Sequence, residues 1–185
     1  MQRCLFFLTL LVWINPSLVT ADPVVGKTYP FNMVDVDGRT LSTHDGHITV
    51  LVIVSRPQAD KARAVGNRVP ERCLGNPRSR MITVIRFDQT RSSFTRYVLT
   101  RLIRRQLDTD AAELKSRYIA KHLTSDPRSD VYAVADFEGQ MVATFGLPAG
   151  PNQFRVLILS GNGQLLQSWT EVPTAEQLNA AIPQL

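Results

Sequence analysis

The sequence is poor in cysteine, because only Cys4 and Cys73 of its 185 residues carry a thiol. Cys4 lies in the N-terminal segment that we interpret below as a signal peptide. After its removal only Cys73 remains, and a single thiol cannot form an intramolecular disulfide. Disulfide cross-links are therefore excluded as a source of stability. A hydrophobic core has to supply it, and about 160 residues are enough to build one.

Long hydrophobic runs are also scarce, and the one conspicuous run stands at the start of the chain. Arg3 precedes apolar residues 5–14, and the small residues 19–21 (Val-Thr-Ala) match a signal peptidase site. The run is shorter than the roughly 20 residues that a membrane span needs. We interpret residues 1–21 as a signal peptide, with an uncleaved anchor as the alternative. Residues 22–185 are then a single exported domain, periplasmic or secreted.

Several motifs of enzymes and metal proteins are missing. The sequence has no Gly-rich phosphate loop, no Gly-x-Ser-x-Gly elbow and no paired-carboxylate signature. His44, His47 and His122 are too dispersed to suggest a metal site, although Asp45 lies beside the first two. We predict neither a metal nor a cofactor.

Positive charge is concentrated in the middle of the chain. Residues 56–121 contain 16 basic and 6 acidic residues, whereas the rest of the exported part contains 4 basic and 10 acidic residues. This excess favours an anionic or acidic partner, such as an envelope polyanion or lipid head groups, and the plainer alternative is a solvated helix face. Two reasons argue against nucleic acid as the partner. The protein is expected to be exported, and we expect Phe94 and Tyr97 to be used in packing and not in stacking on bases.

Hydrophobic patterning at the start of the exported part predicts strands. Residues 31–36 and 39–42 form a hairpin around Asp37-Gly38, a strong turn dipeptide. Residues 48–54 are almost wholly apolar and rich in β-branched side chains, which predicts a central strand covered on both faces.

Helices and strands then alternate. Pro57 suits the first turn of a helix over residues 58–67, and residues 81–87 are the next buried strand. A helix starts at Ser92 or Ser93, and residues 108–110 are a possible interruption of it. We expect one face of this helix to pack against the sheet through Phe94, Val98, Leu102 and Ile103. The other face is expected to be basic and carries Arg96, Arg101, Arg104 and Arg105.

The last third predicts a strand, a hairpin and a helix. Residues 131–135 form the strand, and residues 140–145 are ambiguous between strand and helix. Residues 154–169 form a hairpin around Ser160-Gly161-Asn162-Gly163. Thr174 and Gln177 predict a capping box at the start of the terminal helix.

This element order resembles the thioredoxin-like superfamily, with the hairpin at Asp37-Gly38, the strand at 48–55 and the turn at 160–163 carrying the likeness. It is most similar to the peroxiredoxin (AhpC/TSA-like) and TlpA-like branch and to exported proteins of the YtfJ type. The resemblance implies an α/β fold of three layers, with a central mixed sheet and an N-terminal β-hairpin.

The same resemblance exposes what the chain lacks. A thioredoxin has Cys-x-x-Cys at the start of the helix after the central strand, where the helix N-terminus stabilises a thiolate. Here residues 56–60 read Arg-Pro-Gln-Ala-Asp. A peroxiredoxin has the motif Pro-x-x-x-Thr/Ser-x-x-Cys at this place. Pro57 matches its proline, but Lys61 replaces the Thr or Ser and Ala64 replaces the Cys. The cis-proline of thioredoxins falls near Arg155, and no proline is present there.

Three residues remain as site candidates. Arg56, at a helix start, and Arg155, in place of the cis-proline, could bind an anion together, or could be surface residues. Cys73 could be a buried hydrophobe or a reactive thiol activated by nearby arginines. We therefore expect an exported, redox-inactive thioredoxin-like domain that acts as a binding or accessory module for an anionic partner. The alternative is a thiol-disulfide oxidoreductase or peroxidase that works through Cys73.

Overall fold

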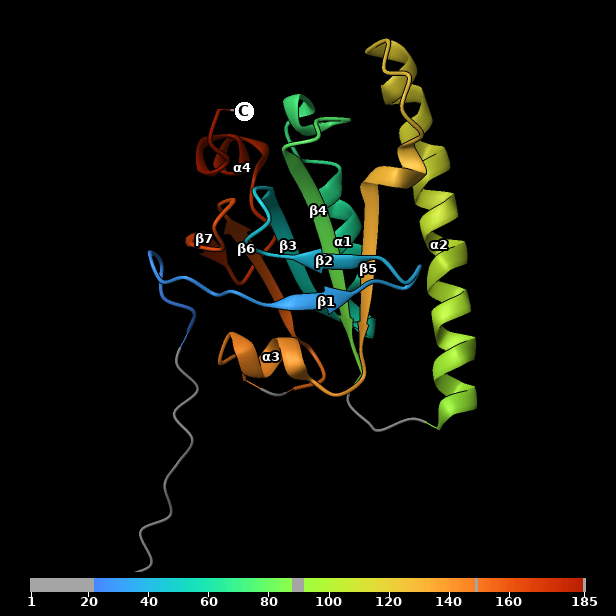
Figure 1. Ribbon diagram of the computed structural model, residues 1–185, viewed down its shortest axis with the longest axis vertical. Coiled ribbons are helices and arrows are strands. Elements are labelled where there is room, and N and C mark those ends of the chain that lie inside the picture. The colour runs from blue at the N-terminus through green and yellow to red at the C-terminus, as the bar shows by residue number, and fades with distance from the viewer. Residues whose placement is uncertain (1–21, 88–91, 149, 185) are drawn as a thin grey trace, which may run out of the picture.

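A mixed five-stranded sheet forms the centre of the protein (Figure 1). The computed structural model describes residues 22–87, 92–148 and 150–184, so the expected signal peptide lies outside the described residues. The strand order is β5-β4-β3-β6-β7; β3, β4 and β5 are parallel, and β6 and β7 are antiparallel to their neighbours. The strands are β3 Ile48–Ser55, β4 Ser79–Arg86, β5 Val131–Asp136, β6 Phe154–Leu159 and β7 Leu165–Trp169.

Strand β3 is the middle of the sheet, as its composition predicts. Every residue from Thr49 to Ser55 is buried, because β4 and β6 bond to its two edges and other elements cover its two faces. A strand buried on both faces needs apolar side chains at successive positions, and the run Val50 to Val54 provides them.

One face of the sheet is covered by the hairpin β1 (Asn32–Val34) and β2 (Thr40–Ser42) together with the short helix α3 (Gln140–Thr144). Beneath them lies a core that includes Leu51, Ile53, Ile82, Leu157 and Phe145. The ambiguous segment 140–145 is helical at its start because the Asp136 carboxylate accepts hydrogen bonds from the backbone N–H groups of Gln140 and Met141.

The opposite face is covered by α1 (Ala59–Gly66) and α4 (Ala175–Ala181). A 3₁₀ turn, η1 (Arg56–Gln58), contains Pro57 and leads from β3 directly into α1. The capping box predicted for α4 is confirmed: Thr174 Oγ1 accepts from the Gln177 backbone N–H, and the Gln177 side chain accepts in return.

Helix α2 (Ser93–Ala120) is 28 residues long and stands beside β5 at the edge of the sheet. Of the two predicted caps, Ser92 is the one whose side chain caps the helix, and the possible interruption at residues 108–110 does not occur. Asp108 and Asp110 remain within the helix because cations from outside it balance both carboxylates: Arg128 pairs with Asp108 and Arg63 with Asp110.

The packed face of α2 differs from the expectation. Ile103 is buried, as predicted, but Phe94, Val98 and Leu102 are exposed. The buried side chains are Ile103, Leu107, Ala111 and Tyr118. Ile103 and Leu107 belong to a buried apolar cluster that also contains Ala133 of β5. A second apolar stripe of α2 is therefore left facing solvent. None of the helices in the described ranges combines the length and the apolar character needed to cross a membrane.

Candidate functional site

The carboxyl end of β3 leads into α1, which is the position where the sequence resemblance places a reactive cysteine. Ser55 ends the strand and is fully buried, and its backbone N–H donates to the Gln153 carbonyl at 2.9 Å. Arg56 and Pro57 follow in η1. The protein therefore has the strand-to-helix junction that the resemblance predicts, but Ser55 and Arg56 stand there in place of cysteine.

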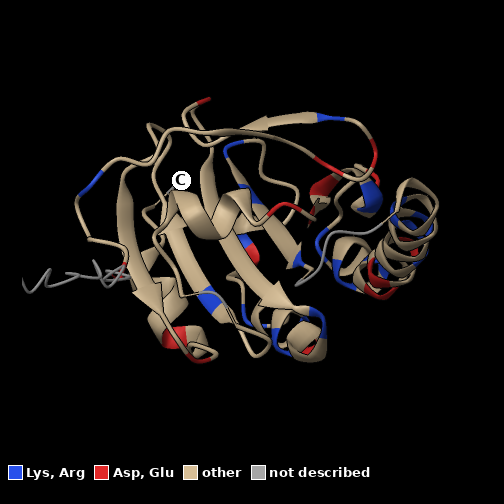
Figure 2. Ribbon diagram, turned by 90° about the horizontal axis from the view of Figure 1, so that it is seen from below, with Lys and Arg blue, Asp and Glu red and all other residues tan. Residues whose placement is uncertain are grey.

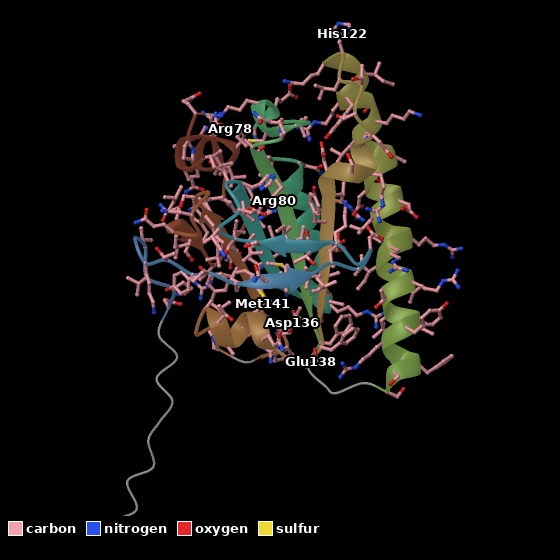
Figure 3. All side chains as sticks on the ribbon, viewed as in Figure 1. Arg78, Arg80, His122, Asp136, Glu138 and Met141 are labelled. Atoms are coloured by element: carbon pink, nitrogen blue, oxygen red, sulfur yellow. The ribbon has the colours of Figure 1, made fainter. Side chains whose placement is uncertain are left out.

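Polar residues end the three parallel strands at this junction. Ser55, Arg86 and Asp136 lie side by side in the register of β3, β4 and β5. Gln153, immediately before β6, accepts a hydrogen bond from Arg86 Nη1 through its side-chain oxygen at 2.8 Å. Figure 3 places Asp136 near Met141, at the end of the sheet where α3 begins. Sequence reasoning missed this polar row, although each of its three strand residues closes an apolar run.

Asp136 is buried, and its environment alters its acidity. Burial raises the pKa of Asp136, whereas hydrogen bonds from the backbone N–H groups of Met141, Gln140 and Gly139 and the charge of Arg86 oppose the rise. Since these backbone groups belong to the first turn of α3, the carboxyl group works here as a helix cap.

The row includes buried polar atoms that make no hydrogen bond to the described residues. Ser55 Oγ and the Gln153 side-chain nitrogen are buried and make no hydrogen bond to any described residue. Buried polar atoms in native proteins nearly always have a partner, so these two mark a place where a water molecule or a polar ligand atom can bind.

The structure does not bring Arg56 and Arg155 together. Arg155 lies in β6 opposite Ile53, is 9% exposed, and pairs with Asp22 at 2.7 Å. Arg56 is exposed and borders a cavity together with Val54, whose side chain packs on the other face of the sheet. Gln153, not Arg155, precedes β6 beside Ser55, and no peptide bond among the described residues is cis.

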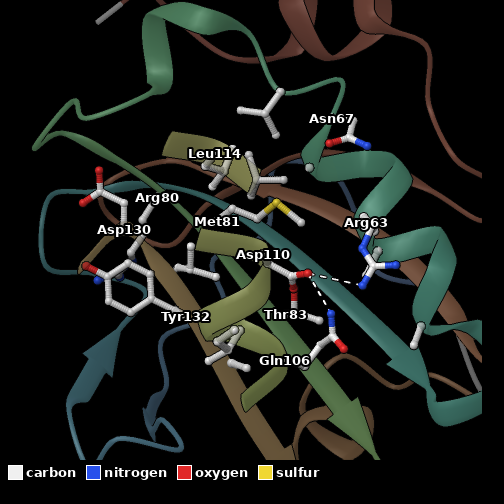
Figure 4. Close-up of a pocket in the computed structure, with 18 of the residues that line it drawn as sticks. Arg63, Asn67, Arg80, Met81, Thr83, Gln106, Asp110, Leu114, Asp130 and Tyr132 are labelled. Carbon is white, nitrogen blue, oxygen red and sulfur yellow. Dashed lines mark hydrogen bonds and ion pairs between the residues drawn. The ribbon is translucent and has the colours of Figure 1, made fainter. Parts of the chain in front are cut away.

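The cavity that Arg56 borders lies between α1 and α2 and has a volume of about 540 Å³ (Figure 4). Its floor is the side of β4 that carries Met81, Thr83 and Ile85. Arg63 of α1 and Asp110 of α2 bridge it with a contact of 3.2 Å, and Gln106 donates to the same carboxylate oxygen at 2.9 Å.

Several solved structures with a similar fold are named as redox proteins. A thioredoxin-family thiol:disulfide interchange protein from Chlorobium tepidum TLS has a TM-score of 0.52 and 10% identity, covering 87% of this chain and 96% of that one. Peroxidoxin BcpB from Mycobacterium tuberculosis has a TM-score of 0.51 and 14% identity, covering 87% and 94%. A putative DsbE from Chlorobium tepidum has a TM-score of 0.51 and 11% identity, covering 86% and 99%.

The chain has a thioredoxin-like fold. No protein-family profile matches it, and neither does any curated protein. Identities between 10% and 14% establish the architecture alone, so the chemistry has to be argued from the side chains in place.

In this thioredoxin-like domain Cys73 lies far from the junction. It ends the 3₁₀ turn η2 (Glu71–Cys73), and its carbonyl accepts from Ser79 Oγ at the start of β4. Ser55 is seven residues along the sheet from the level of Ser79, which is roughly 23 Å at about 3.3 Å per residue. The thiol is half-buried, and burial raises the pKa of Cys73 against the opposing influence of Ser79 and Arg72.

The predicted basic face of α2 is divided in two. Arg96 pairs with Glu138, and Arg104 approaches Asp37 and donates to the Val36 carbonyl, so both contact the domain. Arg101 and Arg105 are exposed, and Arg101 Nη1 donates to Tyr97 Oη at 3.3 Å within the same helix, which Figure 2 shows nearly end-on at one side of the molecule. They share that surface with exposed Phe94 and other apolar side chains.

Proposed function

We propose that this thioredoxin-like protein is an exported binding or accessory module that works without thiol chemistry and attaches to anionic lipid head groups. The observation that carries the proposal is the solvent-facing stripe of α2, on which exposed aromatic and aliphatic side chains alternate with arginines. We call it the outer stripe of α2; its residues are Phe94, Tyr97, Val98, Arg101 and Arg105.

The spacing of these five residues places them on one side of the helix. Successive residues rotate by about 100°, so positions 94, 97, 98, 101 and 105 fall within an arc of roughly 100°. Ile103 and Leu107, which are buried, lie on the opposite side. Phe94 is 77% and Tyr97 58% exposed. The apolar side chains of the stripe therefore have no packing role within the described domain.

The composition of the stripe favours a lipid surface over a soluble polyanion. Aromatic rings with arginines on one face of a helix are typical of segments that lie in the membrane interface, with the rings at the level of the head groups. A purely ionic contact with a polyanion would use the arginines and leave the rings in water. The absence of acidic residues from Ser92 to Leu107 adds charge complementarity to anionic lipid.

Two observations support a mode of action without the thiol. The strand-to-helix junction has no sulfur, and Cys73 lies at the other end of the sheet with a pKa that burial raises. A reactive cysteine needs the opposite, a lowered pKa in an accessible, electropositive place. No observation on the described residues favours the alternative of catalysis through Cys73.

Vesicle co-sedimentation tests the proposal. The purified protein is mixed with vesicles of phosphatidylglycerol or phosphatidylcholine at 0.1 M and 0.5 M salt, as approximate conditions at which screening differs. We expect binding to the anionic vesicles alone, weakened by salt. The double variant Arg101→Ala, Arg105→Ala should weaken it about 30-fold, since each arginine near an anionic surface contributes about 1 kcal/mol.

Arg78→Ala is the matched control, because Arg78 is also exposed and lies near the opposite end of the molecule from the start of α2 (Figure 3). Phe94→Ser tests the apolar part of the stripe and should weaken binding without changing the salt dependence. Equal losses for the Arg101/Arg105 and Arg78 variants, or no preference for anionic vesicles, would contradict the proposal.

A further inference from the structure

The cavity between α1 and α2 leaves the middle of the sheet uncovered on one side. β4 is bonded on both edges, to β3 and to β5, yet Met81, Thr83 and Ile85 are only partly buried on this face. The side chains on its other face, Ile82 and Val84, are completely buried. An apolar strip inside a sheet, open over a volume of about 540 Å³, lies within the size range of small-molecule pockets, roughly 300–1,000 Å³.

We propose that this cavity binds one long-chain fatty carboxylate, with the hydrocarbon chain along β4 and the carboxylate on Arg56. The site is on the inner side of α2, whereas the function proposed above uses the outer stripe of the same helix. The two proposals therefore rest on different residues and can fail separately.

The floor of the cavity favours a hydrocarbon chain over a peptide. Since both edges of β4 are already bonded to neighbouring strands, a peptide in the cavity would find no backbone partner there. Buried peptide N–H and C=O groups without partners are costly. An alkyl chain has no such groups, and Leu107 and Leu114 of α2 together with Ala62 of α1 offer it apolar walls.

The length of the cavity also suits an acyl chain. Its lining extends along β4 from the level of Ser79 to that of Phe87, which is roughly 25 Å at about 3.3 Å per residue. One acyl chain spans half of the bilayer hydrocarbon core, about 15 Å. The cavity therefore has room for one chain with its head group at the rim.

The charges around the cavity assign the head group to Arg56. Three of the four arginines in the lining have an acidic partner: Arg63 pairs with Asp110, Arg80 with Asp45 and Arg117 with Glu71. Arg56 has no acidic partner among the described residues. A guanidinium binds a carboxylate through two parallel hydrogen bonds, so exposed Arg56 offers an anion the one uncompensated cation of the cavity lining.

The contact between Arg63 and Asp110 crosses the cavity and joins its two walls. Arg63 and Asp110 are both partly exposed. A pair of this kind contributes little to stability and can open at small cost. It therefore allows a chain to enter from the solvent side and then to be covered.

Isothermal titration calorimetry of the purified protein with dodecanoate, tetradecanoate and 1-dodecanol tests the site. We expect saturable binding of one molecule, with tetradecanoate about 15-fold tighter than dodecanoate because two more methylenes are buried. Arg56→Gln should weaken dodecanoate about tenfold and leave 1-dodecanol unchanged. Thr83→Trp, which fills the floor, should remove saturable binding of both.

Leu114→Trp blocks the cavity from the opposite wall and replaces Thr83→Trp in the test if that variant does not fold. Arg78→Gln is the matched control for Arg56→Gln, because it also removes one exposed arginine. The Arg101→Ala, Arg105→Ala protein should bind dodecanoate normally, and Thr83→Trp should bind anionic vesicles normally. The proposal is overturned if the wild type shows no saturable binding. It is also overturned if Arg56→Gln weakens the acid and the alcohol equally, or if neither tryptophan variant changes binding.

Discussion

Arg80 of β4 and Asp45 of the loop before β3 form an ion pair through two contacts, Nη1 to Oδ2 at 2.9 Å and Nη2 to Oδ1 at 3.0 Å. The Arg80 side chain is 6% exposed, and it also donates to Thr49 Oγ1. The pair joins the central strands to the segment that follows the N-terminal hairpin, so Asp45 supplies the charge that allows Arg80 to be buried.

The pH dependence of unfolding in acid should reveal the contribution of the ion pair between Arg80 and Asp45 to stability. Partial burial acts to raise the pKa of Asp45, but hydrogen bonds from His47 and Arg80 and the charge of Arg80 outweigh it and lower the pKa to about 2. A carboxyl with a depressed folded-state pKa stabilises the protein above its unfolded value and loses that contribution as the pH falls through the folded value. The Asp45 contribution should therefore disappear between about pH 4 and pH 2.

Asp45→Asn should lower the free energy of unfolding at pH 7 by about 2 kcal/mol, because a buried guanidinium loses its counter-ion. It should also flatten the acid limb of the stability curve, measured by urea unfolding across pH. Asp60→Asn is the control, since the Asp60 side chain is 99% exposed and should change neither quantity. An unchanged acid limb in Asp45→Asn would show that Arg80 does not depend on this carboxylate.

Position 161 requires a glycine because the backbone of Gly46 lies very close to it. A Cβ atom on Gly161 would lie 2.7 Å from the Gly46 carbonyl oxygen, and Gly46 cannot withdraw freely because its N–H donates to the Gly161 carbonyl at 2.9 Å. Gly161→Ala should therefore cost about 2 kcal/mol of stability. Gly150→Ala, which meets no atom within 4 Å, should change the melting temperature little. Equal melting temperatures for both variants would contradict this packing.

The Cys73 thiol should react slowly. It packs against the apolar cluster under α1 and α4, and burial raises its pKa. Alkylation by iodoacetamide at pH 7 should be slower in the folded protein than in urea, and its rate should rise only at alkaline pH. A folded-state reaction faster than the unfolded one, with a midpoint below pH 7, would identify an activated thiol.

Local signals in the sequence were sufficient for most elements of the fold. The β-branched run that became β3 and the capping box at Thr174 each depend on neighbouring residues alone, and both are confirmed. The packed face of α2 was predicted wrongly because the helix carries two apolar stripes. Periodicity reveals both stripes but cannot tell which one meets the sheet, since that depends on the position of β5.

The site was harder to predict for a similar reason. Arg86, Asp136 and Gln153 are brought together by strand register across more than 60 residues of sequence, which no local pattern encodes. Arg155 was expected beside Arg56. Because side chains alternate along a strand, its place in β6 opposite Ile53 turns it toward the other face of the sheet, and Gln153 takes the position next to Ser55.

The central claim is that this thioredoxin-like scaffold acts by binding and not through sulfur. Turnover assays of disulfide reduction and peroxide consumption, run on the purified protein beside Cys73→Ser, test it most directly. The account predicts that both proteins give the same background rate and that both bind anionic vesicles equally well. Turnover by the wild type that disappears in Cys73→Ser would contradict it.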